Sequence, residues 1–221
     1  MQAMEKSKPT ADVGPSAFIV MHGHMTCHLP PPDKTIAAAK KQLRSIMIKT
    51  RENAHTLNPQ AALQLRDIAL QHLVFPPQCK IASYHNFGSE ISPHPLTDVL
   101  RMQGHTILLP VIAHKSSPLL FRVHKQSDIL IPGWQGILEP PPSAPLEIPD
   151  ILFVPLLAFN RHFYRLGYGG GYYDRTLAEL RKQKNILAIG MAFASQEKDD
   201  IPLNSNDVQL DKIVTEVEFL G

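Results

Sequence analysis

The sequence predicts an α/β protein: a single three-layer α/β/α domain with a mostly parallel central sheet, preceded by a poorly ordered N-terminal extension. After Pro77, short β-prone runs alternate with helical stretches, which is the pattern of an α/β fold. Residues 151–154 and 186–190 are apolar at successive positions, as in strands covered on both faces. We therefore expect parallel pairing for the central strands.

Residues 1–33 mix proline, glycine, histidine and small polar residues without periodicity. We expect them to form the extension, and residues 34–221 to form the domain. The extension contains His22, His24, Cys27 and His28, with a spacing that can chelate a transition metal. A disordered histidine-rich arm explains the same residues without any ligand, so the sequence leaves both interpretations open.

Two helices are predicted before Pro77. The first begins at Asp33, a residue suited to capping, and the second begins with Asn58 as cap and Pro59 as its first residue. Helical spacing gives each an apolar side. The expected apolar positions are Ile36, Ala39, Leu43 and Ile46 in the first helix, and Leu63, Leu65, Ile68 and Leu73 in the second.

Strands and further helices follow in alternation. The proline-rich stretch 131–149, which contains Trp134, is predicted to be a long irregular connection, and such loops are usually functional or mobile. The expected strands are 80–84, 105–112, 118–123, 148–154, 185–193 and 212–217, and the expected helices are 95–103 and 172–182.

Composition excludes several classes of protein. The chain has 221 residues, 43% of them hydrophobic, and a formal net charge of +2, which is too small to indicate a nucleic-acid or membrane partner. Its two cysteines, Cys27 and Cys79, form no CxxC motif, and a reducing cytoplasm is the simplest explanation. The apolar run 151–159 is far shorter than the ~20 residues of a membrane helix. We expect a cytoplasmic monomer with small-molecule partners.

Four glycines lie within residues 165–175, RLGYGGGYYDR. Because glycine is costly inside regular elements, they indicate a loop that needs positive φ or close approach of a ligand. The loop N–H groups and the start of the next helix attract phosphate, and Arg165 can add a charge-assisted contact. Asp174 lies where it can bind Mg²⁺ beside phosphates. A tight turn is the alternative, because the spacing is neither that of a Walker nor of a Rossmann loop.

The motif RLGYGGGYYDR resembles the signature of the 5-formyltetrahydrofolate cyclo-ligase family, also called methenyltetrahydrofolate synthetases. The segments AKKQLR, YHNFGSEI, GI-x-EP at 136–140 and DILFVPLLAF extend the similarity over residues 35–218. The resemblance implies ATP- and Mg-dependent cyclisation of 5-formyltetrahydrofolate to 5,10-methenyltetrahydrofolate, with release of ADP and phosphate, through a phosphorylated formyl intermediate. A paralogue acting on another small molecule, or a non-catalytic nucleotide- or folate-binding protein, is the alternative.

In this family a basic pair on the first helix contacts the ATP phosphates, and Lys40 and Arg44 match it. Residues four apart share a helix face, where like charges repel unless an anion lies between them. A solvated basic face is the structural alternative. The resemblance assigns to ATP Lys40, Arg44, Arg165, Leu166, Gly167, Tyr168, Gly169, Gly170, Gly171, Tyr172 and Tyr173, with Lys40, Arg165 and Tyr173 as the catalytic residues.

The family's folate site includes a glutamate in the segment that here reads YHNFGSEI, which is Glu90. Its carboxylate can accept hydrogen bonds from pterin N–H groups, and capping of the next helix is its alternative role. Trp134 matches a tryptophan near the family's substrate cleft. The residues assigned to the folate are His85, Glu90, Trp134, Tyr168, Gly169, Gly170, Gly171 and Tyr172.

Asp174 and Asp207 match the family's metal-binding aspartates, so Mg²⁺ is the implied metal and ATP the implied co-substrate. Asp207 follows asparagines and a serine that favour a turn, and Asp211 is a competing candidate.

The chain departs from the family pattern just before the glycine motif. It has Leu156 for a glycine, Asn160 for an aspartate and Phe163 for a turn glycine. We expect these changes to bear on ligand affinity more than on the type of reaction.

Overall fold

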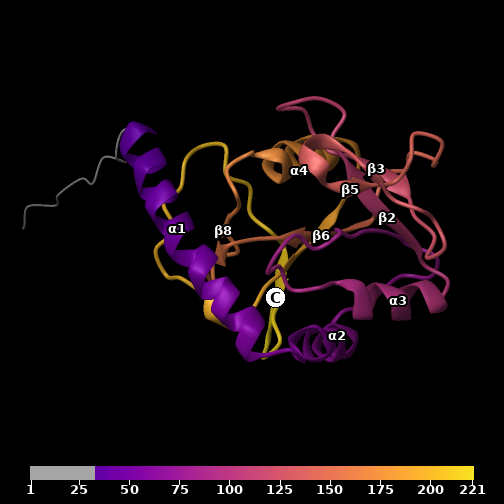
Figure 1. Ribbon diagram of the computed structural model, residues 1–221, viewed down its shortest axis with the longest axis horizontal. Coiled ribbons are helices and arrows are strands. Elements are labelled where there is room, and N and C mark those ends of the chain that lie inside the picture. Colours follow the sequence, from indigo (N-terminus) through magenta and orange to yellow (C-terminus); the bar gives the residue numbers. More distant parts are fainter. Residues whose placement is uncertain (1–32) are drawn as a thin grey trace, which may run out of the picture. The chain divides into compact units, whose positions relative to one another are not determined.

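A computed structural model describes residues 33–221 (Figure 1). The predictions for the extension and for its His/Cys cluster lie outside these residues, apart from Asp33, which begins helix α1 as expected. Within the described part of the chain, no helix has the length and apolar character needed to cross a bilayer.

The middle layer of residues 33–221 is a seven-stranded sheet. Its central strands pair in parallel, and the strand at each edge is antiparallel to its neighbour. The predicted mostly parallel sheet is thus confirmed. In sheet order the strands are β11 (Phe219–Leu220), β10 (Lys212–Val214), β9 (Leu187–Met191), β6 (Ile151–Pro155), β1 (Lys80–Ala82), β2 (Thr106–Val111) and β3 (Leu120–Val123).

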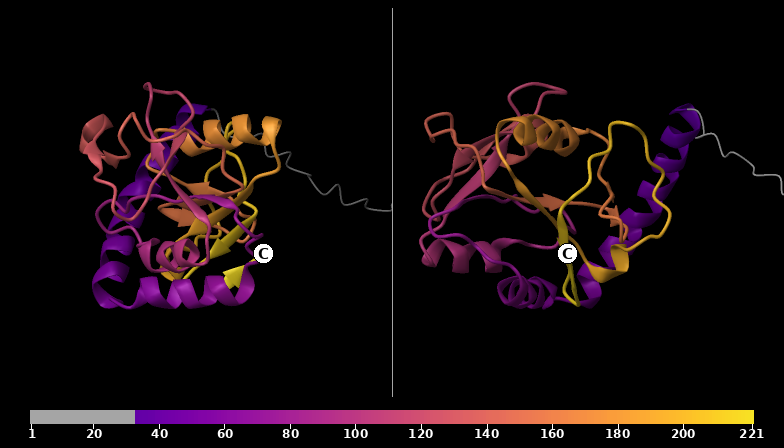
Figure 2. Two further views of the ribbon diagram at one scale, coloured as in Figure 1. Left: turned by 90° about the vertical axis from the view of Figure 1, so that its right-hand side faces the viewer. Right: turned by 180° about the vertical axis from the view of Figure 1, so that it is seen from behind.

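Helices cover both faces of this sheet, which confirms the three-layer α/β/α architecture. Helices α2 (Ala61–His72) and α3 (His94–Met102) pack on one face, and α4 (Tyr172–Gln183) packs on the other (Figures 1 and 2). The two apolar cores follow from this arrangement, because the buried strands present apolar side chains to both sides.

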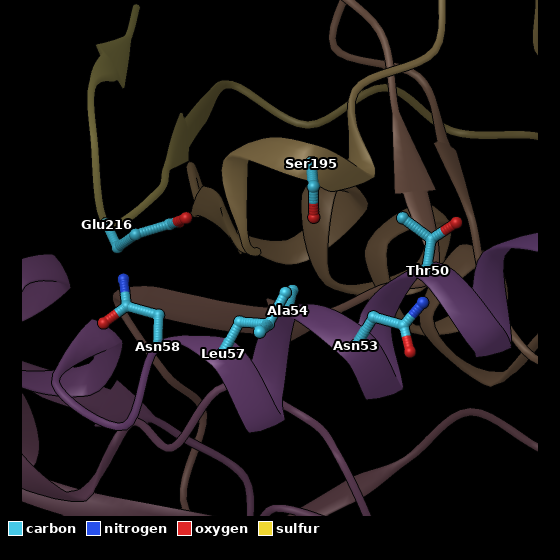
Figure 3. A pocket seen from close by; sticks show the side chains of 7 residues that line it. All are labelled: Thr50, Asn53, Ala54, Leu57, Asn58, Ser195 and Glu216. Atoms are coloured by element: carbon cyan, nitrogen blue, oxygen red, sulfur yellow. The ribbon is translucent and has the colours of Figure 1, made fainter.

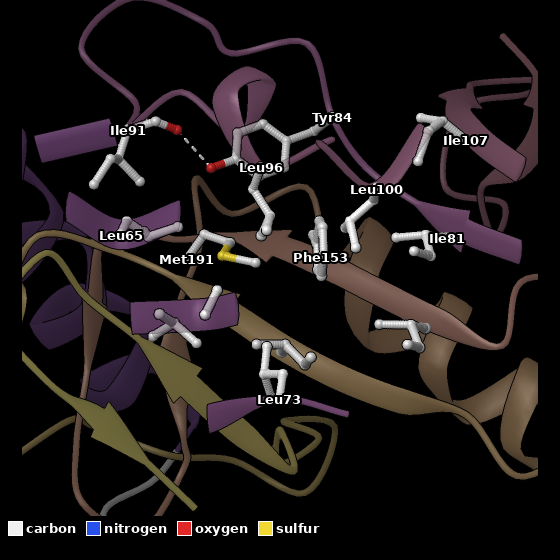
Figure 4. Packing of buried hydrophobic residues seen from close by; sticks show 14 of the residues in the cluster. Leu65, Leu73, Ile81, Tyr84, Ile91, Leu96, Leu100, Ile107, Phe153 and Met191 are labelled. Atoms are coloured by element: carbon white, nitrogen blue, oxygen red, sulfur yellow. Dashed lines mark hydrogen bonds between the residues drawn. The ribbon is translucent and has the colours of Figure 1, made fainter. Parts of the chain in front are cut away.

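The core between the sheet and helices α2 and α3 is built from large aliphatic and aromatic side chains. Phe153 of β6 and Ile81 of β1 belong to the same buried cluster as Leu65 of α2 (Figure 4). Tyr84 lies in this cluster as well, and its hydroxyl donates a hydrogen bond of 2.6 Å to the carbonyl of Ile91. A buried hydroxyl without a partner would be costly, so this bond allows tyrosine in an apolar core.

Helix α1 (Asp33–Leu57) lies at the carboxyl edge of the sheet rather than over a face. Met47 is fully buried against Leu157 and Leu166, which follow β6, and against Ile201, which follows β9. Figure 1 shows the helix running past β8 (Arg165–Leu166), with β6 pointing toward it. The helix therefore closes the edge at which the parallel strands end.

The strand order contains a switch point between β1 and β6. From β1 the chain passes through α3 to β2 on one side, and from β6 it passes through α4 to β9 on the other. The two helices lie on opposite faces, so the loops that leave β1 and β6 separate at the carboxyl edge. Ligands of open α/β sheets bind at such a point.

The predictions for the first two helices need three corrections. Helix α2 begins at Ala61 and not at Pro59, because the Asn58 side chain accepts a hydrogen bond from the Gln60 N–H within a turn. In α1, Met47 takes the core position that we predicted for Ile46, which is exposed. Leu63, predicted for the apolar side of α2, is also exposed.

The connection at 131–149 is less irregular than predicted. It contains a small antiparallel hairpin of β4 (Ile131–Pro132) and β5 (Leu138–Glu139), joined through the 3₁₀ turn η1 (Trp134–Gly136). A second hairpin that the sequence did not reveal, β7 (Ala158–Phe159) with β8 (Arg165–Leu166), leads into the glycine loop.

Candidate functional site

One face of helix α1 presents the buried Lys40 and the half-buried Arg44 to two loops at the carboxyl edge of the sheet. The Lys40 ammonium lies 2.6 Å from both carboxylate oxygens of Asp207. One turn further, the Arg44 Nε donates a hydrogen bond of 2.8 Å to the Gly167 carbonyl. The alternative of a solvated basic face is therefore excluded for both residues, since each holds a loop that lies far away in the sequence.

The glycine loop has the geometry that its composition predicted. Gly169 has φ +106° and Gly171 has φ +64°, values that favour glycine. A Cβ atom at Gly169 would lie 3.2 Å from the guanidinium carbon of Arg44. Gly171 is the residue that precedes α4, so the loop backbone passes directly into a helix N-terminus. Such a loop offers N–H groups to an anion without a dedicated side chain.

Leu166, a member of the predicted ATP set, has a side chain that is buried in the core against α1. Its backbone alone is available to a ligand.

Arg165 and Asp174 form a buried ion pair behind the glycine loop. The Arg165 side chain is only 4% exposed, and its Nη2 lies 2.7 Å from Asp174 Oδ1. Its Nη1 donates to the Val208 carbonyl at 2.6 Å, and the Val208 N–H donates to the same Asp174 oxygen. Burial lowers the pKa of Arg165, and the Asp174 charge opposes this shift. The structure thus directs Arg165 at Asp174, where it fixes the carboxylate in place.

The two candidate metal ligands differ in what they offer. Within residues 33–221, no three His, Cys, Asp or Glu side chains gather into a metal cage. Asp174 uses only Oδ1 in hydrogen bonds in this part of the chain, so Oδ2 can face an ion. Asp207 has both oxygens bound to Lys40 and also caps the Asn204 N–H. A single carboxylate fits Mg²⁺, which usually keeps waters and phosphate oxygens as its other ligands.

Asp211, the competing candidate, lies elsewhere. Its carboxylate accepts hydrogen bonds from the Ala188 N–H, at the start of β9, and from Arg181. The Val208 N–H binds Asp174, and Val208 directly follows Asp207 in the sequence. Asp207 is therefore the aspartate that lies beside Asp174.

Glu90 follows β1 and is buried beside the glycine loop. It is 6% exposed, and its Oε2 accepts a hydrogen bond of 2.9 Å from the Phe87 N–H. Burial raises the pKa of Glu90, and the Phe87 N–H and the Arg51 charge oppose this shift. Glu90 does not cap helix α3, which begins at His94 after Pro93. The structural alternative for this carboxylate is therefore wrong.

Arg51 is a site residue that the sequence reasoning missed. It is 2% exposed, and its Nε donates to the Ser89 hydroxyl at 3.1 Å. Its guanidinium also binds the Tyr168 hydroxyl and lies over the Tyr168 ring, 5.2 Å from the centroid. The sequence contained a signal for this role, because Arg51 lies on the same face of α1 as Lys40, Arg44 and Met47.

The two tyrosines that begin α4 face different surroundings. Tyr172 lies under the guanidinium of Arg175, 5.1 Å from the ring centroid. Burial raises the pKa of Tyr173 far above its ordinary value, and the Glu90 charge adds to the shift while Arg165 opposes it. Tyr173 therefore stays neutral and can donate a hydrogen bond, and the charges of Glu90 and Arg165 both act on it.

Two residues predicted for the folate make no hydrogen bond or ion pair with this cluster among the described residues. Trp134 is 42% exposed in the turn between β4 and β5. The His85 ring packs edge-on against His94 at the start of α3, with centroids 5.5 Å apart. His85 still belongs to the loop that leaves β1 at the switch point.

The departures from the family pattern keep the turn before the glycine loop intact. The Asn160 side-chain oxygen accepts hydrogen bonds from the N–H groups of His162 and Tyr164, as a carboxylate would. Phe163 adopts φ +63°, the conformation for which a glycine is suited. Leu156 is buried, and a Cβ at Gly190 would meet it at 3.0 Å. The neighbouring residues thus accommodate each change.

A separate surface pocket lies at the other end of α1. Its volume is about 370 Å³, and Figure 3 shows Ser195 and Glu216 facing the α1 side chains across it. None of the residues predicted from the sequence lines this pocket. Its lining residues are Thr50, Asn53, Ala54, Leu57, Asn58, Ser195 and Glu216.

We predict that Gly169→Ala weakens the use of a phosphate ligand by about tenfold while the protein still folds. The side chain would be strained at φ +106° by about 1–2 kcal/mol and would displace Arg44. Gly167→Ala is the matched control, because a Cβ there meets nothing within 4 Å and φ is not positive. Isothermal titration with Mg-ATP tests this, and equal affinity in both variants would contradict it.

The fold and the site together define an α/β enzyme with a glycine-rich loop at the switch point of its sheet. A family model described as the 5-formyltetrahydrofolate cyclo-ligase family matches residues 36–216. The chain therefore belongs to this family, whose members are ligases. The cyclo-ligase of Haemophilus influenzae is 34% identical over 177 residues, which is 77% of this chain and 94% of the relative. That of Escherichia coli K12 is 32% identical over 178 residues, which is 76% of this chain and 96% of the relative.

Solved structures are similar as well. The NMR structure of the 5,10-methenyltetrahydrofolate synthetase of Aquifex aeolicus has a TM-score of 0.68 at 26% identity, and covers 81% of this chain and 91% of that protein. The synthetase of Mycoplasma pneumoniae has a TM-score of 0.63 at 24% identity, covering 80% of this chain and 98% of that protein, and supports the fold alone.

Proposed function

We propose that this protein catalyses the ATP-dependent cyclisation of 5-formyltetrahydrofolate to 5,10-methenyltetrahydrofolate, with release of ADP and phosphate. Family membership supports the reaction. The observation that carries the proposal is that Arg51 links the glycine loop, at Tyr168, with the buried carboxylate of Glu90 at the switch point, while Arg44 binds the same loop. The loop suits phosphates and the carboxylate suits the N–H groups of a pterin, so both substrates would meet there.

The chemical difficulty is a poor leaving group, since a formyl oxygen does not depart as hydroxide. Transfer of the γ-phosphoryl group of ATP to this oxygen gives a phosphorylated formyl intermediate. N10 of the folate then attacks the formyl carbon, and phosphate leaves with the oxygen. The protein's part is to position the groups and stabilise charge, as in other phosphoryl transfers.

Each residue has a defined task in this scheme. Lys40 and Arg44 would hold phosphate oxygens together with the loop N–H groups, and Lys40 would exchange Asp207 for phosphate to do so. Glu90 would bind the pterin N–H groups, and neutral Tyr173 would donate a hydrogen bond between the two substrates. Arg165 would fix Asp174.

The residues present fit one Mg²⁺ ion. Asp174 would hold it through Oδ2, and Asp207 would join only when Lys40 has released it. When bound, the ion would offset charge on the phosphates.

The test is to mix the protein with Mg-ATP and 5-formyltetrahydrofolate and to record the near-ultraviolet absorbance of the methenyl product. We expect product in proportion to ATP consumed, and its loss when the metal is removed with EDTA and restored by added Mg²⁺. ATP binding without product would favour a carrier, and ATP consumption with another formylated substrate would favour a paralogue. Either result would overturn the proposal.

The remaining expectations belong to the same proposal. Residues 34–221 would form the catalytic domain, to which residues 1–33 are appended. The enzyme would act as a cytoplasmic monomer on small molecules, without nucleic acid or a membrane as partner. Sedimentation with and without ATP would test the monomer.

A further inference from the structure

Arg51 joins the two loops that separate at the switch point. Its guanidinium donates to Ser89, in the loop after β1, and to Tyr168, in the glycine loop after β6. Because Arg51 lies on the rigid helix α1, these bonds fix the two loops relative to each other.

The same guanidinium lies beside Glu90 without binding it closely. Arg51 Nη1 is 3.6 Å from Glu90 Oε1, and within residues 33–221 this buried Nη1 has no hydrogen-bond partner. Among those residues Glu90 Oε1 accepts no hydrogen bond either, since Phe87 uses Oε2. The positive charge therefore stabilises the buried carboxylate while one of its oxygens stays available to a ligand.

We propose that Arg51 is a positioning residue that keeps Glu90 ionised for recognition of pterin N–H groups, and aligns it with the glycine loop through Tyr168. This inference rests on the proposed function. Among the described residues, the other titratable groups that act on or are acted on by Glu90 are Tyr84 and Tyr173, whose pKa values are both raised by burial. Among the described residues, Arg51 is thus the cation whose charge acts on the pKa of Glu90.

The experiment measures the binding of 5-formyltetrahydrofolate by calorimetry from pH 6 to 8. In the wild type we expect affinity to change less with pH than in the variant, because the Arg51 charge favours the ionised carboxylate of Glu90. In Arg51→Gln the pKa of Glu90 rises, so the dissociation constant should increase as pH falls, by up to about tenfold per pH unit below the new pKa. Arg66→Gln is the control, because Arg66 pairs with Asp67 on α2, outside the site.

Two further variants separate positioning from structure. In Arg51→Gln/Glu90→Gln the binding should be weak but independent of pH, since no carboxyl remains to titrate. Arg51→Lys keeps the charge, and should keep the pH dependence of the wild type even if Arg51→Gln fails to fold. The same loss of affinity at every pH in Arg51→Gln, or a pH dependence in Arg51→Lys equal to that of Arg51→Gln, would overturn the inference.

Failure of the proposed function gives a different result. The wild type would then bind no 5-formyltetrahydrofolate at any pH. NMR titration of the Glu90 carboxyl in ligand-free protein would still show whether Arg51→Lys preserves the pKa that Arg51→Gln raises. An unchanged pKa in Arg51→Gln would overturn the role of Arg51 independently of any ligand.

Discussion

Asp174→Asn should lower kcat/KM for Mg-ATP by about a thousandfold and raise the Mg²⁺ concentration needed for half-maximal activity. Such a loss corresponds to about 4 kcal/mol of transition-state stabilisation. The amide can still accept hydrogen bonds from Val208 and Arg165 at one oxygen. The asparagine NH2 group takes the place of the second carboxylate oxygen, and its hydrogens repel a cation. The measurement is the initial rate over a matrix of ATP and Mg²⁺ concentrations.

The same change has a structural cost, because it leaves the Arg165 guanidinium buried without a countercharge. We expect a loss of about 3 kcal/mol in the free energy of unfolding, at the low end for a broken buried pair. Urea unfolding without metal measures this loss of stability separately from the loss of metal binding. Asp98→Asn is the control, since Asp98 pairs with Arg101 near the surface and should change stability by no more than about 0.5 kcal/mol. An unchanged Mg²⁺ requirement would make Asp174 purely structural.

The strands and the glycine loop were predictable because local chemistry determines them. The apolar run behind the strand predicted at 148–154 does form a buried strand, β6 (Ile151–Pro155). Gly169 and Gly171 adopt positive φ, as glycines in a ligand-binding loop were expected to do. The order of the strands is not local, so the switch point between β1 and β6 became visible only in the structure.

The buried charges were less predictable because their partners are distant in sequence. Lys40 pairs with Asp207, 167 positions away, and Arg51 with Tyr168, 117 positions away. The sequence shows that Arg51 shares a helix face with Lys40 and Arg44, but it shows neither the burial of Arg51 nor its partners. Asp207 was predicted as a metal ligand, which stays a prediction, and its ion pair with Lys40 could not be foreseen from the residue types alone.

Gln196→Met should destabilise the fold by about 4 kcal/mol, the largest loss in stability that we expect from a polar residue. Gln196 is 1% exposed in the turn η2 (Ala194–Gln196) after β9. Its amide donates to the carbonyls of Leu156 and Leu157, and its oxygen accepts from the Phe193 N–H. Methionine fits the space but leaves these three backbone groups unpaired, at about 1–3 kcal/mol each when they act alone.

The carbonyls that Gln196 binds lie where β6 turns toward the glycine loop, so the change should also lower activity per folded molecule. Gln183→Met is the matched control, because Gln183 is exposed on α4 and should shift stability by less than about 0.5 kcal/mol. Equal unfolding midpoints in urea for the two variants would contradict the prediction.

Gln196→Glu tests the direction of these hydrogen bonds. An ionised carboxylate would face two carbonyl oxygens and could not donate to them, so its folded-state pKa should rise above the unfolded value. A carboxyl with a raised pKa costs stability above its unfolded pKa, and the cost shrinks as pH falls and the group becomes a donor. The gap in unfolding free energy between Gln196→Glu and the wild type should therefore narrow from pH 8 to pH 5. A gap that stays constant would mean that the side chain binds Leu156 and Leu157 through water or not at all.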